Sequence, residues 1–265
     1  MNNDNAIGVF DSGIGGLTVL QRIIEVLPRE NTVYLGDTAR APYGTKSVDT
    51  VLRYSFENSA FLVEKGVKAL VVACNTSTAI ALDRLRHHLS IPIVGVIEPG
   101  VRKAVKSTKN KKVGVIGTDA TIQSGAYTQA LKAADPGIEV YSRACPLFVP
   151  LVEEGWTSNP VVDMTVRQYL AGFKQSGIDT LILGCTHYPL LKKAIRNFMG
   201  RGVRLVDSAE ETATEVQAVL KKGACARKSG RGTHSFFVTD APERFVTVGR
   251  RFLGEKVESA VRIER

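Results

Sequence analysis

Short apolar runs rich in Val and Ile alternate along the chain with longer segments of helical period. Most of these runs are apolar throughout, which is typical of strands covered on both faces in a parallel sheet. Between them lie helical patterns, and in one Leu52, Phe56 and Ala60 share a face. The alternation predicts an α/β fold with mainly parallel sheets. The expected strands are Ile7 to Phe10, Val33 to Leu35, Ala69 to Ala73, Ile93 to Ile97, Val113 to Ile116, Thr180 to Leu183 and Arg204 to Val206.

The chain also repeats itself weakly. The segment from Ile7 to Ser12 resembles that from Val113 to Thr118, and Gly66 to Thr76 resembles Gly177 to His187. The two offsets are nearly equal, which predicts two similar, pseudo-symmetric α/β halves with the active site in the cleft between them. Any two parallel strands share Val, Leu and Ile, but this does not explain the cysteine that follows the strand in each half.

The second half finishes near residue 207, and the tail beyond it is too short for a third domain. We expect in the tail a helix from Glu210 to Lys222, a strand from Ser235 to Thr239, and a further helix capped by Asp240 with Pro242 in its first turn. This tail should pack back on the first half. The prediction is a discontinuous first domain, residues 1–98 and 208–265, and a second domain, residues 99–207.

The chain has 35 Lys and Arg against 26 Asp and Glu, a net charge of +9. Such a charge fits either a nucleic-acid partner or an anionic small substrate. The basic residues are spread along the chain, and the two local clusters, 109–112 and 227–231, contain no aromatic side chains. We therefore expect no nucleic acid as partner. A hydrophobic fraction of 44% also excludes a disordered or low-complexity chain.

The longest apolar runs, such as Ala69 to Cys74, fall far short of the roughly 20 residues that cross a bilayer. The N-terminal residues lack the basic start and apolar stretch of a secretory signal. We therefore expect a cytoplasmic protein without a membrane partner, in which the four cysteines are thiols.

A glycine-rich loop leaves a nucleotide-binding function open. Gly13 and Gly15 begin a G-x-G-x-x-G pattern, but Thr18 stands where the last glycine belongs. Asp37 follows near the place of a ribose-binding acid. A tight turn between strand and helix, present in any α/β protein, explains the glycines at least as well. A nucleotide- or nucleic-acid-binding α/β protein is thus the alternative from a different functional class.

Zinc binding finds little support, because no two cysteines have the short paired spacing of structural zinc sites. We expect no metal. Free cysteine often behaves as a small buried hydrophobe, and we expect this of Cys145 and Cys225. Cys74 and Cys185 differ, since each lies between a predicted buried strand and a predicted helix start. There a helix dipole and backbone N–H groups should lower the thiol pKa.

Two such thiols in matched positions would face each other across the cleft, one on each side of a reacting carbon. Four segments carry a resemblance to a known family: Phe10 to Leu17, Gly36 to Gly44, Ala73 to Thr76 and Leu183 to Pro189. Together they resemble the glutamate racemases of the aspartate/glutamate racemase family. The resemblance implies a cofactor-independent isomerase that interconverts L-glutamate and D-glutamate and supplies D-glutamate for bacterial peptidoglycan synthesis. Racemisation of aspartate or another acidic amino acid is the alternative within the same class.

The resemblance also implies the residues of the site. Cys74 would exchange the α-proton of D-glutamate and Cys185 that of L-glutamate, without pyridoxal phosphate, another cofactor or a metal. Asp11, Glu153 and His187 would assist the two thiols. A homodimer is common in the family. The implied substrate-binding residues are Asp11, Ser12, Pro42, Tyr43, Gly44, Cys74, Asn75, Thr76, Cys185, Thr186 and His187.

Overall fold

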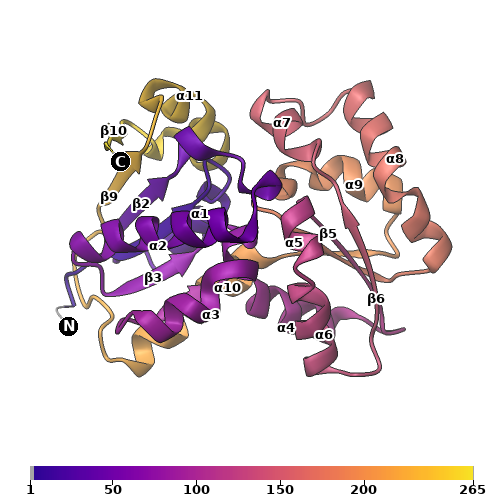
Figure 1. Cartoon of the computed structure of the whole chain (residues 1–265), viewed down its shortest axis with the longest axis horizontal. Helices are drawn as coiled ribbons and strands as arrows, with labels where there is room; N and C mark the ends of the chain where they lie inside the picture. Colours follow the sequence, from indigo (N-terminus) through magenta and orange to yellow (C-terminus); the bar gives the residue numbers. More distant parts are fainter. Residues whose placement is uncertain (1–2, 265) are drawn as a thin grey trace.

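The computed structural model describes residues 3–264, which form two parallel sheets with helices around them (Figure 1). One sheet has six strands in the order β10-β9-β2-β1-β3-β4, and the other has four in the order β6-β5-β7-β8. Every pairing is parallel. The predicted α/β class is confirmed. The strands are β1 (Ile7–Asp11), β2 (Thr32–Gly36), β3 (Ala69–Val72), β4 (Ile93–Gly95), β5 (Lys112–Gly117), β6 (Glu139–Ala144), β7 (Thr180–Gly184), β8 (Arg204–Asp207), β9 (His234–Val238) and β10 (Val261–Arg262).

Several helices begin where the side chain of the preceding residue accepts a hydrogen bond from the first turn. Ser47 Oγ accepts from the backbone N–H of Thr50, and Asn159 Oδ1 from that of Val162. The α-helices are α1 (Leu17–Val26), α2 (Val48–Glu64), α3 (Asn75–His88), α4 (Ile97–Ser107), α5 (Asp119–Gln123), α6 (Ala126–Ala134), α7 (Phe148–Glu153), α8 (Pro160–Ser176), α9 (Lys192–Met199), α10 (Ser208–Lys222) and α11 (Pro242–Leu253). Short 3-10 helices cover Thr38–Arg40, Tyr43–Thr45, Tyr188–Leu191 and Gly254–Lys256.

The two sheets share one arrangement. The order β2-β1-β3-β4 in the first corresponds to β6-β5-β7-β8 in the second. β1 pairs with β3 as β5 pairs with β7. The repeat in the sequence therefore reflects two halves with the same strand order. Cys185 directly follows β7, and Cys74 follows the equivalent strand β3 after one intervening residue.

The C-terminal tail joins the first sheet, where β9 pairs with β2 and β10 pairs with β9. Helix α10 packs against α1 and also against α4, so it lies where the two halves meet. We propose that residues 1–98 and 208–265 form one domain and residues 99–207 the other. The division of the strands between the two sheets supports these boundaries.

Some expected elements differ from the structure. The strand expected from Ile93 to Ile97 ends at Gly95, because α4 already begins at Ile97. The sequence does not predict β6 and β10, since β6 is an edge strand with a half-exposed, mixed sequence and β10 has only two residues. Asp240 is not the cap of α11: the cap position is Ala241, whose φ is 48° and which makes no side-chain cap hydrogen bond. The main chain of Asp240 is instead hydrogen-bonded to Thr38 Oγ1.

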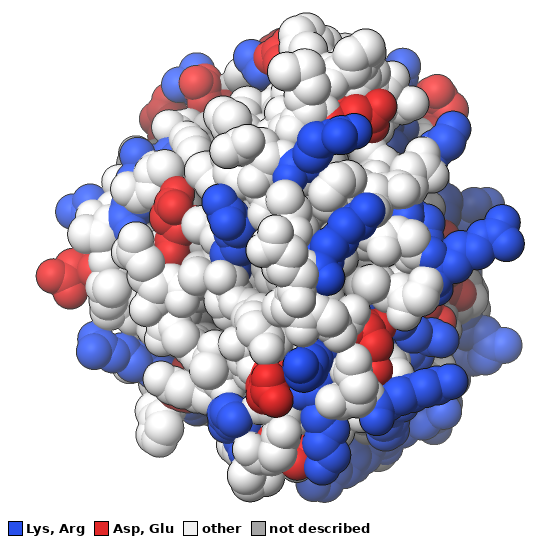
Figure 2. Space-filling model, turned by 90° about the vertical axis from the view of Figure 1, so that its right-hand side faces the viewer, with Lys and Arg blue, Asp and Glu red and all other residues white. Residues whose placement is uncertain are grey.

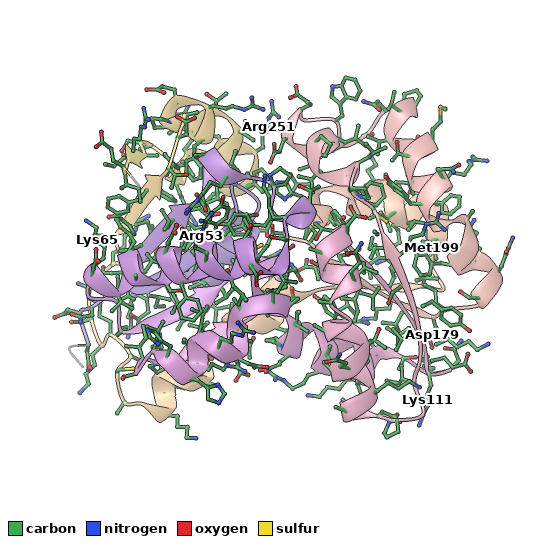
Figure 3. All side chains as sticks on the ribbon, in the orientation of Figure 1. Arg53, Lys65, Lys111, Asp179, Met199 and Arg251 are labelled. Atoms are coloured by element: carbon green, nitrogen blue, oxygen red, sulfur yellow. The ribbon has the colours of Figure 1, made fainter. Side chains whose placement is uncertain are left out.

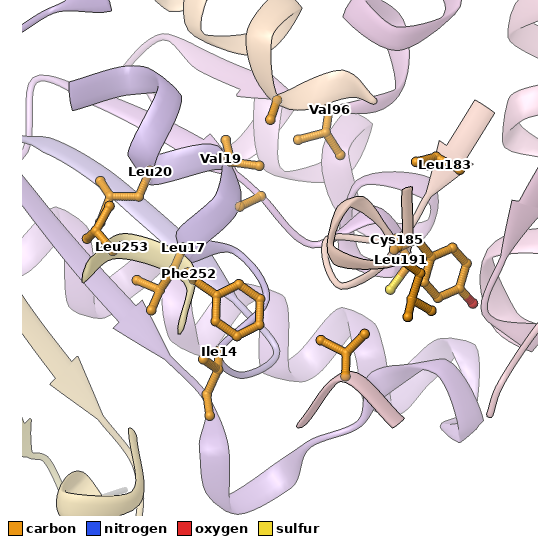
Figure 4. Close-up of a cluster of buried hydrophobic side chains, with 14 of the residues drawn as sticks. Ile14, Leu17, Val19, Leu20, Val96, Leu183, Cys185, Leu191, Phe252 and Leu253 are labelled. Atoms are coloured by element: carbon orange, nitrogen blue, oxygen red, sulfur yellow. The ribbon is translucent and has the colours of Figure 1, made fainter. Parts of the chain in front are cut away.

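The largest hydrophobic cluster extends through both halves, and Figure 4 shows part of it. Cys145 and Cys225 belong to this cluster, which confirms that both are buried. All four cysteines are free thiols. Within residues 3–264, no helix is long and apolar enough to span a membrane.

Most of the excess of Lys and Arg over Asp and Glu lies in residues 99–207. Figure 2 shows the end of the molecule formed by this half, where basic side chains are spread over the face and outnumber the acidic ones. A positive potential on this half favours the approach of an anionic small molecule.

Candidate active site

The carboxyl ends of the central strands of both sheets border one cavity. Ligands of parallel sheets collect at such ends. The cavity is a narrow slot with an empty volume of about 400 Å³, its open mouth included. It is lined by Ser12, Gly13, Ala41, Pro42, Tyr43, Gly44, Cys74, Asn75, Thr76, Thr118, Val149, Glu153, Cys185, Thr186 and His187.

The structure thus brings together at this cavity every residue that the sequence predicted for the site, except Asp11. Asp11 does not line the cavity but lies fully buried behind its wall. One carboxylate oxygen of Asp11 accepts the backbone N–H of Gly13 at 3.0 Å, and the other accepts Thr186 Oγ1 at 3.4 Å. Asp11 therefore connects the loop after β1 to the loop after β7.

Cys74 is the N-cap residue of α3, where its Sγ accepts the backbone N–H of Ser77 at 3.5 Å. Burial and the nearby charge of Asp11 raise the pKa of the Cys74 thiol to about 11, although the Ser77 N–H acts in the opposite direction. The helix start acts in the expected direction, but the expected net lowering of the Cys74 pKa is wrong. Desolvation of the charged sulfur outweighs the hydrogen bond from the backbone.

Cys185 has different neighbours. Its Sγ lies 3.9 Å from Nδ1 of His187, whose Nε2 lies 3.1 Å from Oε1 of Glu153. Burial alone would lower the pKa of His187, but its contacts with Cys185 and Glu153 outweigh burial and raise the pKa to about 10. The hydrogen bond with His187 in turn lowers the pKa of Glu153. At neutral pH the pair is an imidazolium and a carboxylate beside the sulfur.

The loop that carries Tyr43 and Gly44 is anchored by Asp37. The buried carboxylate of Asp37 accepts hydrogen bonds from the Tyr43 hydroxyl, from Nε of Arg40 and from Oγ1 of Thr239. Asp37 thus holds the wall of the cavity and does not face a ribose. Arg40 belongs to this anchor and stacks on Tyr54, with 4.0 Å between the guanidinium carbon and the ring centroid.

Close packing between the halves explains the glycines near the site. A Cβ on Gly15 would overlap His187 and Thr186, and one on Gly44 would lie 2.5 Å from Cβ of Thr118. These glycines let the two halves approach each other, which no other residue type allows. At Gly15, the resemblance to a dinucleotide-binding loop therefore reflects tight packing against the loop after β7.

Three threonine hydroxyls join the halves at the cavity wall. Thr76 Oγ1 lies 2.9 Å from that of Thr118 and 3.1 Å from that of Thr121, and the last two lie 2.9 Å apart. In addition, the Tyr127 hydroxyl donates to Oδ1 of Asn75 at 2.6 Å. No sequence motif points to Thr118 or Thr121. The internal repeat does align Thr118 with Ser12, and this correspondence is the one signal that could identify Thr118 as a site residue.

Within the described residues 3–264, no group of three or more His, Cys, Asp or Glu side chains has an arrangement that could hold a metal ion. The described lining side chains also include no Lys or Arg. An anionic ligand would therefore meet hydroxyls, amides, backbone N–H groups and the His187 imidazolium.

Comparison with known proteins gives a consistent result. A model of the Asp/Glu/Hydantoin racemase family matches residues 7–216. The glutamate racemase of Geobacter metallireducens is 58% identical over 95% of this chain and 94% of its own length. The crystal structure of a glutamate racemase from Bacillus anthracis is 43% identical, with a TM-score of 0.94 over 100% of this chain and 98% of that chain. A glutamate racemase from Francisella tularensis, solved in complex with D-glutamate, is 39% identical, with a TM-score of 0.93 over 99% of this chain and 98% of that chain.

The chain belongs to the Asp/Glu/Hydantoin racemase family. Within that family, the three proteins compared above, which match it over nearly its whole length, are glutamate racemases.

Proposed function

We propose that the protein is a cofactor-independent glutamate racemase that uses Cys74 and Cys185 as its two acid/base groups. The observation that carries this proposal is their placement. The two cysteines follow equivalent strands of two similar sheets, and both line one cavity. Two acid/base groups on opposite sides of one carbon are what inversion by proton exchange requires.

The proposed reaction needs no external redox partner. A thiolate on one side accepts the α-proton, and the electron pair of the broken C–H bond passes into the α-carboxylate. A thiol on the other side then donates its proton to the opposite face, which leaves the mirror-image amino acid and exchanges the states of the two sulfurs. The α-proton is weakly acidic, so positioning and electrostatic stabilisation of the carbanion-like transition state must supply most of the rate.

The surroundings of the cavity suit an amino acid with two carboxylates. Helix α3 begins at Asn75, and Asn75 and Thr76 of its first turn line the cavity. Helix N-termini favour anions. We assign Ser12, Asn75, Thr76 and Thr186 to the α-carboxylate and ammonium groups. The second carboxylate would bind near Gly44 and the hydroxyl of Thr118.

Charge balance supports an ammonium group near Asp11. Burial raises the pKa of Asp11, although the charge of His187 and the backbone N–H groups of Gly13 and Gly16 act against this. A substrate ammonium placed between Asp11 and Cys74 would offset the charge that disfavours the Cys74 thiolate. The narrow cavity implies that its walls part to admit the amino acid and close again around it.

The biological role that we propose is the supply of D-glutamate for peptidoglycan synthesis in the cytoplasm. A homodimer is proposed as well. Four large apolar side chains are exposed between residues 147 and 164, a stretch that contains α7 and the start of α8, and we propose that a second copy covers them. They are Leu147, Trp156, Val161 and Met164. Sedimentation of the protein with Met164→Glu beside the unchanged chain tests this surface.

Circular dichroism of purified protein with L-glutamate in D₂O, without added cofactor, tests the activity. We expect the signal to decay to zero while the α-hydrogen is replaced by deuterium. L-aspartate in the same assay is the comparison, and we expect much slower decay because its carboxylate stands one methylene nearer to the α-carbon. Unchanged L-glutamate, or faster turnover of L-aspartate, would contradict the assignment.

A further inference from the structure

A contact between α11 and α7 crosses from one half of the molecule to the other. Nη1 of Arg251, in the last turn of α11, donates to the backbone carbonyl of Glu153 at 2.9 Å. Figure 3 shows Arg251 at the gap between these two helices. Glu153 is the last residue of α7, where carbonyl groups have no partner within the helix. The guanidinium therefore caps the helix that carries Glu153.

The chain is shaped to accept this guanidinium. Gly155 follows α7 with a φ of 79°, and a Cβ at that position would lie 2.6 Å from Nη1 of Arg251. A residue with a side chain would displace the guanidinium from the end of α7.

A connected series of contacts leads from Arg251 to a cysteine of the cavity. The Glu153 carboxylate holds Nε2 of His187, and Nδ1 of His187 faces the Sγ of Cys185. The residue after Arg251 supports the same ring, because the Phe252 and His187 rings meet edge to face with 6.0 Å between their centroids. Phe252 and Cys185 belong to the hydrophobic cluster of which Figure 4 shows part.

We propose that Arg251 is a positioning residue for the Cys185 side of the reaction: it fixes the end of α7, and thereby the Glu153–His187 pair, against Cys185. This inference rests on the proposed racemase function and extends it to a residue outside the cavity. On the Cys74 side the corresponding groups, Asp11 and Ser77, come from β1 and α3 of the same half as Cys74. The Cys185 side in addition depends on α11, a helix from the other half, for its alignment.

The charged and titratable groups around the pair are few. Cys185 and Glu153 contact His187, and Asp11 acts on it through charge. Arg244 of α11 acts on Glu153 through charge and lies 3.6 Å from the carboxylate of Glu154. Any pH readout must be compared between variants that keep these groups, because each of them affects the His187–Glu153 pair.

Three variants separate position from charge. Arg251→Met removes both the hydrogen bond and the charge, whereas Arg251→Lys keeps a donor and the charge. Gly155→Ala keeps Arg251 but displaces its guanidinium, and it also strains the backbone after α7, where φ is 79°. The matched control is Arg250→Ala, one residue earlier in the same helix, where Arg250 pairs with Glu255 at 3.6 Å. We expect Arg251→Met and Gly155→Ala to lower kcat/KM roughly tenfold to 100-fold, since displacement of catalytic groups by about 1 Å has effects of this size.

The kinetic isotope effect identifies which side is affected. The equilibrium constant of racemisation is one, so kcat/KM for L-glutamate always equals kcat/KM for D-glutamate. A variant therefore lowers both values by the same factor, and the rates alone do not show which cysteine is affected. If proton transfer at Cys185 is slowed, the effect of α-deuteration on kcat/KM should rise for L-glutamate and fall for D-glutamate. We expect this opposite change in Arg251→Met and Gly155→Ala, partial recovery in Arg251→Lys, and no change in Arg250→Ala.

Equal changes of the two isotope effects, or unchanged kinetics in Arg251→Met with the fold intact by circular dichroism, would overturn the positioning role. NMR titration of His187 supplies a readout that does not need turnover. Its pKa of about 10 should fall in Gly155→Ala and stay in Arg250→Ala. If the unchanged protein does not racemise glutamate, the proposed function fails, and this titration alone still decides whether Arg251 positions the pair: an unshifted His187 in Gly155→Ala would refute it.

Discussion

Cys74 and Cys185 follow equivalent strands of two similar sheets, yet the groups around the two sulfurs differ in kind. Cys74 accepts a backbone N–H at the start of α3 and has the buried carboxylate of Asp11 nearby. Cys185 faces the imidazolium of His187, which Glu153 holds from the other side. The repeated scaffold sets where the thiols lie, and the local residues set their electrostatic surroundings.

The difference follows from the substrate that we propose. An α-amino acid and its mirror image place the same carbon between the two thiols, and the repeated sheets supply that symmetry. Its ammonium and carboxylate groups have no such symmetry, because one is a cation and the other an anion. The carboxylate of Asp11 near Cys74 suits the substrate ammonium, and the imidazolium of His187 near Cys185 suits a substrate carboxylate.

The largest expected effect comes from removing either thiol. Cys74→Ala and Cys185→Ala should each lower kcat by a factor of about 10² to 10⁴ or more, since one general acid or base usually contributes a factor of this size. Racemisation of both enantiomers, followed by circular dichroism, measures this. Cys225→Ala is the matched control, since Cys225 is a buried free thiol outside the cavity. Near-normal turnover in either of the first two variants would end the two-thiol account.

A smaller loss is expected where the halves meet. Thr118→Val removes the hydroxyl that bonds to Thr76 and Thr121 and that we assign to the second carboxylate. A hydrogen bond to a charged group contributes about 1.5–3 kcal/mol, so KM should rise roughly tenfold to 100-fold while kcat changes less. Steady-state kinetics with L- and D-glutamate measure the two constants. A selective loss of kcat would place Thr118 in the chemistry and not in binding.

The Cys185 side has a testable dependence on pH. The pKa of His187 is about 10, so activity that needs the imidazolium should decline as the pH rises through that value. Glu153→Gln removes one of the contacts that raise this pKa, and the decline should begin at lower pH. The raised pKa also stabilises the fold fully below pH 6.5 and loses this contribution as the pH passes about 10. The pH profiles of kcat/KM for both proteins test this, and an unmoved alkaline limb would contradict it.

The smallest change concerns the Cys74 side. Asp11→Asn removes the charge that, after burial, most raises the pKa of Cys74. The thiolate of Cys74 should then form at a pH below about 11, as followed by its ultraviolet absorbance in a Cys185→Ala background. Cys145 and Cys225 are present both with and without Asp11→Asn, so their contribution to the absorbance cancels in the difference between the two titrations. A titration that does not shift would show that burial alone sets this pKa.

Much of this arrangement was predictable from the sequence, because buried parallel strands are apolar and cysteines are conspicuous where such strands end. The position of β6 was not, since its residues Glu139–Ala144 are exposed or only partly buried and lack that pattern. The raised pKa of Cys74 also escaped prediction, because it depends on how deeply the fold buries the sulfur and on a carboxylate from another strand. The contact of Arg251 with Glu153 joins residues that lie far apart in the sequence and have no local motif.

The most direct test of the central claim is a crystal structure with bound D-glutamate. The account predicts the α-carbon between the two sulfurs, with Sγ of Cys74 and Sγ of Cys185 on opposite faces at roughly 3–3.5 Å, the separation of groups ready to react. Both sulfurs on one face of the carbon, or either sulfur turned away from the ligand, would contradict it.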